Sequence, residues 1–137
     1  MIGLIAMSKV MDETGQTTVL AQGVAAVTGG TYPILSPFIG LLGTFMTSSN
    51  LSSNILFSGF QQQVGMMLHV DKAQLLAVQT VGASIGSIIA PSKVLLGTTA
   101  AGILGKEGDV IHKFLFGAML LCGIFGLIIF ISYKFGW

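Results

Sequence analysis

The stretch "TSSNLSSN" at residues 47–54 decides the fold. All of its side chains except that of Leu51 carry a hydroxyl or an amide, and apolar segments flank it, "PFIGLLGTFM" at 37–46 and "ILFSGF" at 55–60. Polar, irregular backbone is tolerated at membrane depth only where protein or a water-filled cavity surrounds it. The length of the flanking segments therefore determines where this polar stretch can lie.

The composition is typical of a chain embedded in a membrane. Its 137 residues are 53% hydrophobic and 8% charged, with a mean hydropathy of +0.88, whereas soluble domains carry roughly 25% charged residues. Six lysines, no arginine and five acidic residues give no basic surface for nucleic acid. The single cysteine, Cys122, excludes a disulfide framework and fits a packing role. We therefore expect a lipid bilayer as a partner, and no nucleic acid.

The two apolar legs beside the polar stretch look too short to cross a bilayer. Each leg, 33–46 and 55–68, has about 14 residues and would reach about 21 Å as a helix, against a hydrocarbon core of about 30 Å. One continuous helix would bury the whole polar cluster against lipid. We therefore expect a re-entrant helical hairpin over 33–68, with its polar tip near the bilayer midplane.

Four further segments complete the expected all-α membrane fold. Residues 1–13 resemble the end of a helix that begins upstream, and residues 16–28 have the pattern of an interfacial amphipathic helix. Residues 75–104 form an apolar stretch that Pro91 interrupts, which predicts a broken transmembrane helix. Residues 114–133 form the final transmembrane helix, with an uncharged run of about 18 residues. We expect aqueous loops at "HVDK" and "GKEGDVIHK", which lie on opposite faces of the membrane if the broken helix is a single crossing.

Side chains at the tip are candidate ligands. The hydroxyls and amides of Ser49, Asn50, Ser53 and Asn54, with the backbone donors of a helix N-terminus, could hold an anion or replace an ion's hydration shell. The alternative is an ordinary extramembrane loop between two short helices. The length of the legs favours the tip.

The break at Pro91 supplies a second group of candidates. Lys93 is the only charged residue between Lys72 and Lys106, and an ionisable residue at membrane depth indicates a functional site. If the break lies near the interface, Lys93 instead reaches water along its own stem. Gln79 and Ser92 could line the same cavity as Lys93, together with Ser84 and Ser87. Gly82 and Gly86, just before the break, are typical of close helix packing.

The sequence gives no support to an enzyme, a metal site or a cofactor. It contains no phosphate loop, no G-x-G-x-x-G and no H-E-x-x-H, and all five carboxylates lie in loops or at segment edges. We expect no acidic proton relay inside the apolar segments. If protons are coupled to a transport cycle, they titrate Lys93 or a group outside this chain.

Three ordered motifs resemble the C-terminal part of bacterial L-lactate permeases: "YPILSPFIGLLGTFMTSSNLSSNILFSGFQ" at 32–61, "AVQTVGASIGSIIAPSKVLLG" at 77–97 and "GKEGDV" at 105–110. The resemblance implies a multi-pass bacterial plasma-membrane symporter of protons with lactate and related 2-hydroxy monocarboxylates such as glycolate. It also implies two inverted repeats, each with a re-entrant hairpin that ends in a Ser-Asn tip.

By position, the resemblance places Ser49, Asn50, Ser53 and Asn54 at this tip and Lys93 after the second break. Such permeases are several times longer, so it further implies a C-terminal fragment that needs the missing N-terminal part of the permease as its partner. Two alternatives stay open: a small self-assembling membrane protein, and a truncated remnant that transports nothing.

Overall fold

Short turns divide the chain into a series of helices. In a computed structural model, which describes residues 1–136, helices make up the chain apart from short turns. Those residues contain no strand, so the predicted all-α class is confirmed. In chain order the elements are α1 (Ile2–Glu13), α2 (Gln16–Thr28), the short 3-10 helix η1 (Gly29–Thr31), α3 (Tyr32–Thr47), α4 (Asn50–Leu68), α5 (Lys72–Ile89), α6 (Pro91–Ala100) and α7 (Glu107–Phe135).

The polar stretch at 47–54 is mostly helical, and only two of its residues turn the chain. Ser48 is left-handed, with φ +56°. Ser49 caps α4, because its Oγ accepts the N–H of Ser52 at 3.2 Å, and serine is a favoured N-cap. The 19 residues of α4 reach about 28 Å, so the expected second leg of about 14 residues is wrong. That α3 and α4 re-enter the bilayer stays a prediction.

The helix break lies where Pro91 predicts it. Ala90 has an extended conformation between α5 and α6, and the two helices are bent by 40°. Proline lacks the N–H that would continue the helix and disfavours helical geometry at the residue before it. α6 ends at Ala100, four residues before the predicted end at 104.

The final helix is longer than expected at its start. α7 begins at Glu107, with Glu107 and Asp109 in its first turn, where carboxylates interact favourably with the helix dipole. Of the loop predicted over 105–113, only residues 105 and 106 are outside a helix, and the turn between α6 and α7 covers 101–106 instead. Charged residues at the start of this segment extend the helix rather than ending it.

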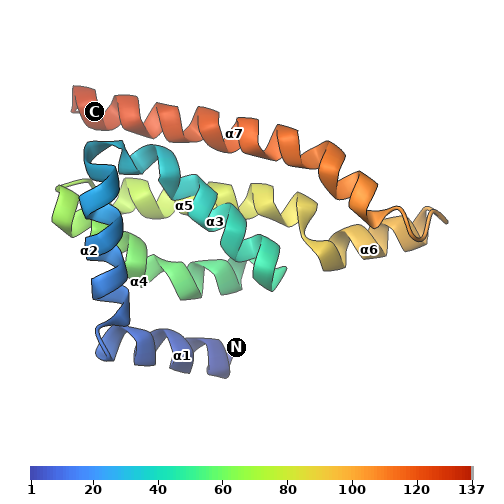
Figure 1. The fold of residues 1–137 in the computed structure, drawn as a ribbon, viewed down its shortest axis with the longest axis horizontal. Coiled ribbons are helices and arrows are strands. Elements are labelled where there is room, and N and C mark those ends of the chain that lie inside the picture. Colours follow the sequence, from blue (N-terminus) through green and yellow to red (C-terminus); the bar gives the residue numbers. More distant parts are fainter. Residues whose placement is uncertain (137) are drawn as a thin grey trace.

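Three helices form the centre of the molecule. α3, α5 and α7 pack against one another, α4 packs against α3 and α5, and α1 and α2 pack against α4. Figure 1 shows α7 along one side of the molecule and α2 running across one end of it. The turn between α3 and α4 consequently lies beside α5 and faces towards its break.

Glycines bring α3 and α5 into backbone contact. A Cβ atom on Gly82 would lie 1.9 Å from the carbonyl oxygen of Pro37, and one on Gly40 would lie 2.1 Å from that of Gln79. A Cβ on Gly86 would lie 2.5 Å from the carbonyl oxygen of Leu41. We call this contact the α3–α5 seam. The predicted packing role of Gly82 and Gly86 is confirmed.

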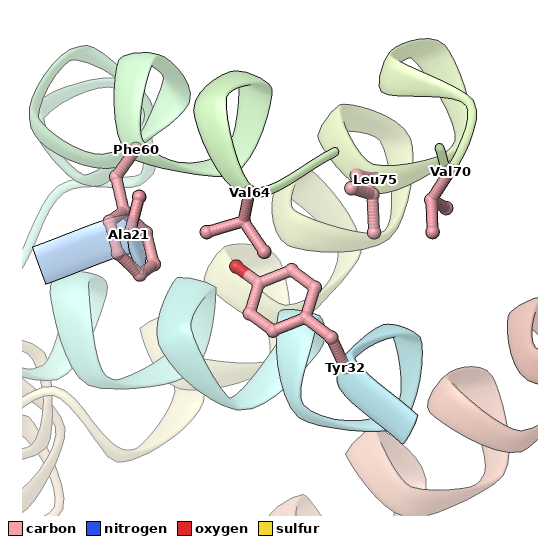
Figure 2. Close-up of a cluster of buried hydrophobic side chains, with 6 residues drawn as sticks. All are labelled: Ala21, Tyr32, Phe60, Val64, Val70 and Leu75. Atoms are coloured by element: carbon pink, nitrogen blue, oxygen red, sulfur yellow. The ribbon is translucent and has the colours of Figure 1, made fainter. Parts of the chain in front are cut away.

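The described residues contain two clusters of buried hydrophobic side chains, and α3 contributes to both. One consists of residues from α2, α3, α4, α5 and the turn before α5: Ala21, Tyr32, Phe60, Val64, Val70 and Leu75 (Figure 2). The other joins α3, α5 and α7: Leu41, Ile85, Ile89, Ala118 and Cys122. Cys122 is fully buried there, which confirms its packing role.

Among residues 1–136, two stretches are long and apolar enough to cross a membrane, by length and composition: Gln16–Thr47 and Glu107–Phe135. α5 and α6 add a third if the bent pair is one span. The first stretch changes direction at η1, where Gly29 has φ +52°, and Figure 1 shows α2 and α3 pointing different ways. The interfacial position of residues 16–28 stays a prediction.

Candidate functional site

The N-terminus of α4 lies against a polar face of α5. Asn50 Nδ2 donates to Ser84 Oγ at 2.7 Å, and Asn54 Nδ2 donates to Thr80 Oγ1 at 3.3 Å. Residues 80, 84 and 87 recur at helical spacing, so Thr80, Ser84 and Ser87 share one side of α5. We call this part of the molecule, from Ser48 to Asn54 with that side of α5, the tip.

The amide side chains at the tip form a directed chain of hydrogen bonds. Gln79 Nε2 lies 3.4 Å from Asn54 Oδ1, and Asn54 Nδ2 donates to Asn50 Oδ1 at 3.0 Å. Asn50 Nδ2 in turn donates to Ser84. Both carbonyl oxygens of the asparagines therefore already accept a hydrogen bond.

The tip has unused hydrogen-bond donors. An amide nitrogen carries two N–H groups, and within residues 1–136 Asn50 uses one of them. The first turn of a helix also leaves backbone N–H groups without an intrahelical partner, here including those of Asn50 and Leu51. A helix N-terminus with spare N–H groups favours an anion.

The two predicted serines of the tip have different surroundings. Ser49 is half-buried, and its Oγ is the cap of α4. Ser53 is fully buried, and its Oγ donates to the carbonyl oxygen of Gly40 at 3.0 Å. Ser53 thus joins α4 to α3, and its hydroxyl faces the protein interior.

Lys93 and Ser92 lie at the other end of the polar face. Both are exposed in the first turn of α6, and the ammonium group of Lys93 contacts Ser87 Oγ. Ser87 is one turn beyond Ser84 on α5, so polar side chains continue from Asn50 to Lys93. Within residues 1–136, Lys93 has no acidic partner.

The structure brings together most of the predicted site residues. Asn50, Asn54 and Gln79 are linked directly, Ser49 caps their helix, and Lys93 extends the same face. The sequence interpretation missed Thr80. A signal was available, because Thr80 lies four residues before Ser84 and so on the same side of a helix.

A second polar group was missed, at the opposite end of α3 and α4. Tyr32 OH and Ser36 Oγ both donate to Gln61 Oε1, at 2.6 and 2.9 Å, and Gln61 Nε2 donates to the carbonyl oxygen of Ser36 at 3.2 Å. All three residues are fully buried. We call this group the base network. Its pairing depends on the register of α3 against α4, which the sequence does not supply.

Comparisons with known proteins show which family the chain is similar to. The family model described as L-lactate permease matches residues 1–135. The chain is 33% identical over 128 residues to the glycolate permease of Escherichia coli (strain K12), covering 93% of this chain and 23% of that protein. It is 33% identical over 129 residues to the L-lactate permease of Halalkalibacterium halodurans, covering 94% of this chain and 23% of the relative.

A third relative, the L-lactate permease of Escherichia coli (strain K12), is 32% identical over 128 residues, which cover 93% of this chain and 23% of that protein. The chain thus spans roughly a quarter of the length of the curated relatives it matches. No solved structure matches it. The family match and the apolar helical stretches identify a membrane protein. The chain belongs to the L-lactate permease family.

Proposed function

We propose that this chain is part of a secondary transporter for lactate and related 2-hydroxy monocarboxylates in a bacterial plasma membrane. Its partner is the rest of a permease, because the chain spans 23% of the length of its relatives. The relatives are named as lactate and glycolate permeases, and both substrates are 2-hydroxy monocarboxylates. Transport is symport with protons.

The observation that carries this proposal is the surplus of donors at the tip. The substrate carboxylate binds the first turn of α4 and the free N–H of Asn50, because that end of a helix favours negative charge. Hydroxyls along the polar face of α5, such as that of Ser84, pair with the 2-hydroxyl of the substrate. A cation would instead need oxygen ligands, and each asparagine oxygen already has one of its two acceptor positions taken by an N–H donor.

Lys93 supplies a positive charge for the substrate carboxylate. It lies at the break between α5 and α6, along the same polar face as Asn50. A lysine far from water is costly, by about 2.5–3.5 kcal/mol on membrane-insertion scales for a helix centre. A bound carboxylate offsets that cost, so Lys93 favours a loaded site.

The α3–α5 seam supports a rigid-body mode of transport. Backbone contact at Gly40 and Gly82 makes the hairpin and α5 a rigid unit, so the tip and the break keep their relative positions. Alternating access then requires rocking of this unit against the rest of the permease, as in transporters that bind substrate at broken helices.

A chimera tests the proposal. This chain replaces the matching segment of the Escherichia coli L-lactate permease, in cells without their own lactate and glycolate permeases. We expect uptake of radiolabelled L-lactate with alkalinisation of the medium. Asn50→Ala and Lys93→Ala should each lower uptake at least about 10-fold, the effect of removing roughly 1.4 kcal/mol of binding free energy.

The matched control is Lys106→Ala, which removes an exposed lysine from the 101–106 loop and should leave uptake unchanged. Unchanged uptake in both Asn50→Ala and Lys93→Ala would reject the site. A chimera that reaches the membrane and transports no lactate would reject the function.

A further inference from the structure

Gln79 is a buried amide at the junction of three helices. Its side chain is fully buried, α3 packs on its backbone through Gly40, and its Nε2 faces α4. The nitrogen lies 3.5 Å from the carbonyl oxygen of Ser53 and 3.4 Å from Asn54 Oδ1. A substrate in the exposed part of the tip does not reach it.

Only one orientation of the Gln79 amide suits these neighbours. The backbone carbonyl of Ser53 can accept a hydrogen bond but cannot donate one. If the amide were flipped, Gln79 Oε1 would face two acceptor oxygens. In the observed orientation Oε1 is buried without a partner in the described residues, so the contacts of the nitrogen outweigh the loss at the oxygen.

The orientation passes from residue to residue. Because Gln79 donates to Asn54 Oδ1, the nitrogen of Asn54 points to Asn50 Oδ1 and Thr80 Oγ1. Because Asn50 Oδ1 accepts from Asn54, the nitrogen of Asn50 points to Ser84 and keeps one N–H unused. In the reversed chain, Asn50 would present its carbonyl oxygen, which repels a carboxylate.

We propose that Gln79 is a positioning residue, which fixes the direction of the amide chain from the Ser53 carbonyl to Asn50 and thereby makes the tip a donor site for a carboxylate. The inference rests on the proposed function for the identity of the substrate. Its structural part, the dependence of Asn54 and Asn50 on Gln79, does not.

The unpaired oxygen of Gln79 supports this role. A methionine or leucine would fill a similar volume without burying an unpaired polar atom, and buried side-chain polar atoms are mostly paired in native structures. An amide is required here only if its N–H groups are needed by α4. Packing alone does not explain a glutamine at this position.

The sequence allows a sharp test, because Asn50 and Asn54 are its only asparagines. The 137-residue chain labelled with ¹⁵N-asparagine in lipid nanodiscs gives two side-chain amide signals, whose exchange with water is measured by NMR. In the unmodified chain, Asn54 should exchange more slowly than Asn50, since both of its N–H groups are bonded. Equal, rapid exchange of the two amides would overturn the inference without any substitution.

The substitution Gln79→Met should raise the exchange rate of the Asn54 amide at least about 10-fold and shift the Asn50 signal. The matched control is Gln62→Met, which alters an exposed glutamine of α4 and should leave both signals unchanged. Signals that Gln79→Met leaves unchanged would overturn the inference.

Uptake by the chimera separates this inference from the proposed function. With Gln79→Met, we expect the KM for lactate to rise at least about 10-fold while the maximal rate stays within about threefold. A normal KM would overturn the positioning role. An unsubstituted chimera that fails to transport lactate rejects the proposed function instead, and the NMR result then still decides how the amide chain is ordered.

Discussion

The base and the tip of the hairpin formed by α3 and α4 both contain hydroxyl and amide side chains, but these side chains differ in burial and in hydrogen bonding. In the base network, every side-chain oxygen and nitrogen of Tyr32, Ser36 and Gln61 has a hydrogen-bond partner, and all three residues are fully buried. At the tip, Asn50 and Asn54 are only half-buried and Asn50 keeps an unused N–H.

The difference separates structural polar groups from binding groups. The Oγ of Ser36 also lies 3.3 Å from the carbonyl oxygen of Leu75, so the base network joins α3, α4 and α5. Within residues 1–136, Gln61 and Asn50 each use one of the two N–H groups of the amide. The unused group of Gln61 is enclosed by protein, whereas that of Asn50 belongs to a half-buried residue that a ligand can reach. An amide in a membrane helix is therefore better judged by whether its unused hydrogen-bonding groups are accessible to a ligand than by its presence.

The largest expected effect comes from forcing α3 and α5 apart, since the contact between them holds the base and the tip in place. Gly82→Val would place a Cβ atom 1.9 Å from the Pro37 carbonyl oxygen, a clash with backbone that only movement of α3 relieves. We expect a loss of at least about 3 kcal/mol in the free energy of unfolding, the upper part of the usual range for overpacking. An unfolding titration in detergent micelles measures it.

Gly117→Val in α7 is the control, because no atom lies within 4 Å of a Cβ there. Equal stability of Gly82→Val and the unmodified chain would contradict the α3–α5 seam. Equal stability would also mean that the seam does not hold the base and the tip at a fixed distance.

The next effect concerns the base alone. Gln61→Leu leaves the hydroxyls of Tyr32 and Ser36 without their shared acceptor in a buried site, which costs about 1–3 kcal/mol. The same titration measures this loss. Asn50→Leu at the tip should cost less, about 0.5–1.5 kcal/mol as for the net loss of a typical hydrogen bond, because Asn50 is only half-buried and its partners can reach other groups. If the tip substitution is the more destabilising of the two, the distinction between base and tip is wrong.

Local chemistry explains which parts of the fold were predictable. Pro91 fixes its own neighbourhood, so the break between α5 and α6 follows from one residue. The start of α4 did not follow from the polar content of 47–54, because Ser49 caps a helix that includes the asparagines. The charges of Glu107 and Asp109 likewise indicated a loop, whereas the helix dipole places them in the first turn of α7.

The candidate site divides in the same way. Asn50 and Asn54 are one turn apart, so the sequence predicts that they share a side of a helix. That they face Thr80 and Gln79, and that Tyr32 reaches Gln61 across 29 residues, depends on how α3, α4 and α5 align. Tight contacts such as those at Gly40 and Gly82 set that alignment, and helical periodicity does not specify it.

The smallest expected effect tests whether the tip needs its cap. Ser49→Ala removes the acceptor of the Ser52 N–H, and loss of an N-cap costs typically about 1 kcal/mol. Ser49→Asp keeps an acceptor in place and adds a negative charge, which stabilises the helix start but repels a carboxylate. Stability should therefore fall with alanine and hold with aspartate, while lactate uptake by the chimera should fall more with aspartate than with alanine. An unfolding titration measures the stability of the two variants, and the uptake assay measures their transport. If uptake follows stability in both variants, the tip acts only as a helix cap, and the contrast with the base network no longer marks a binding site.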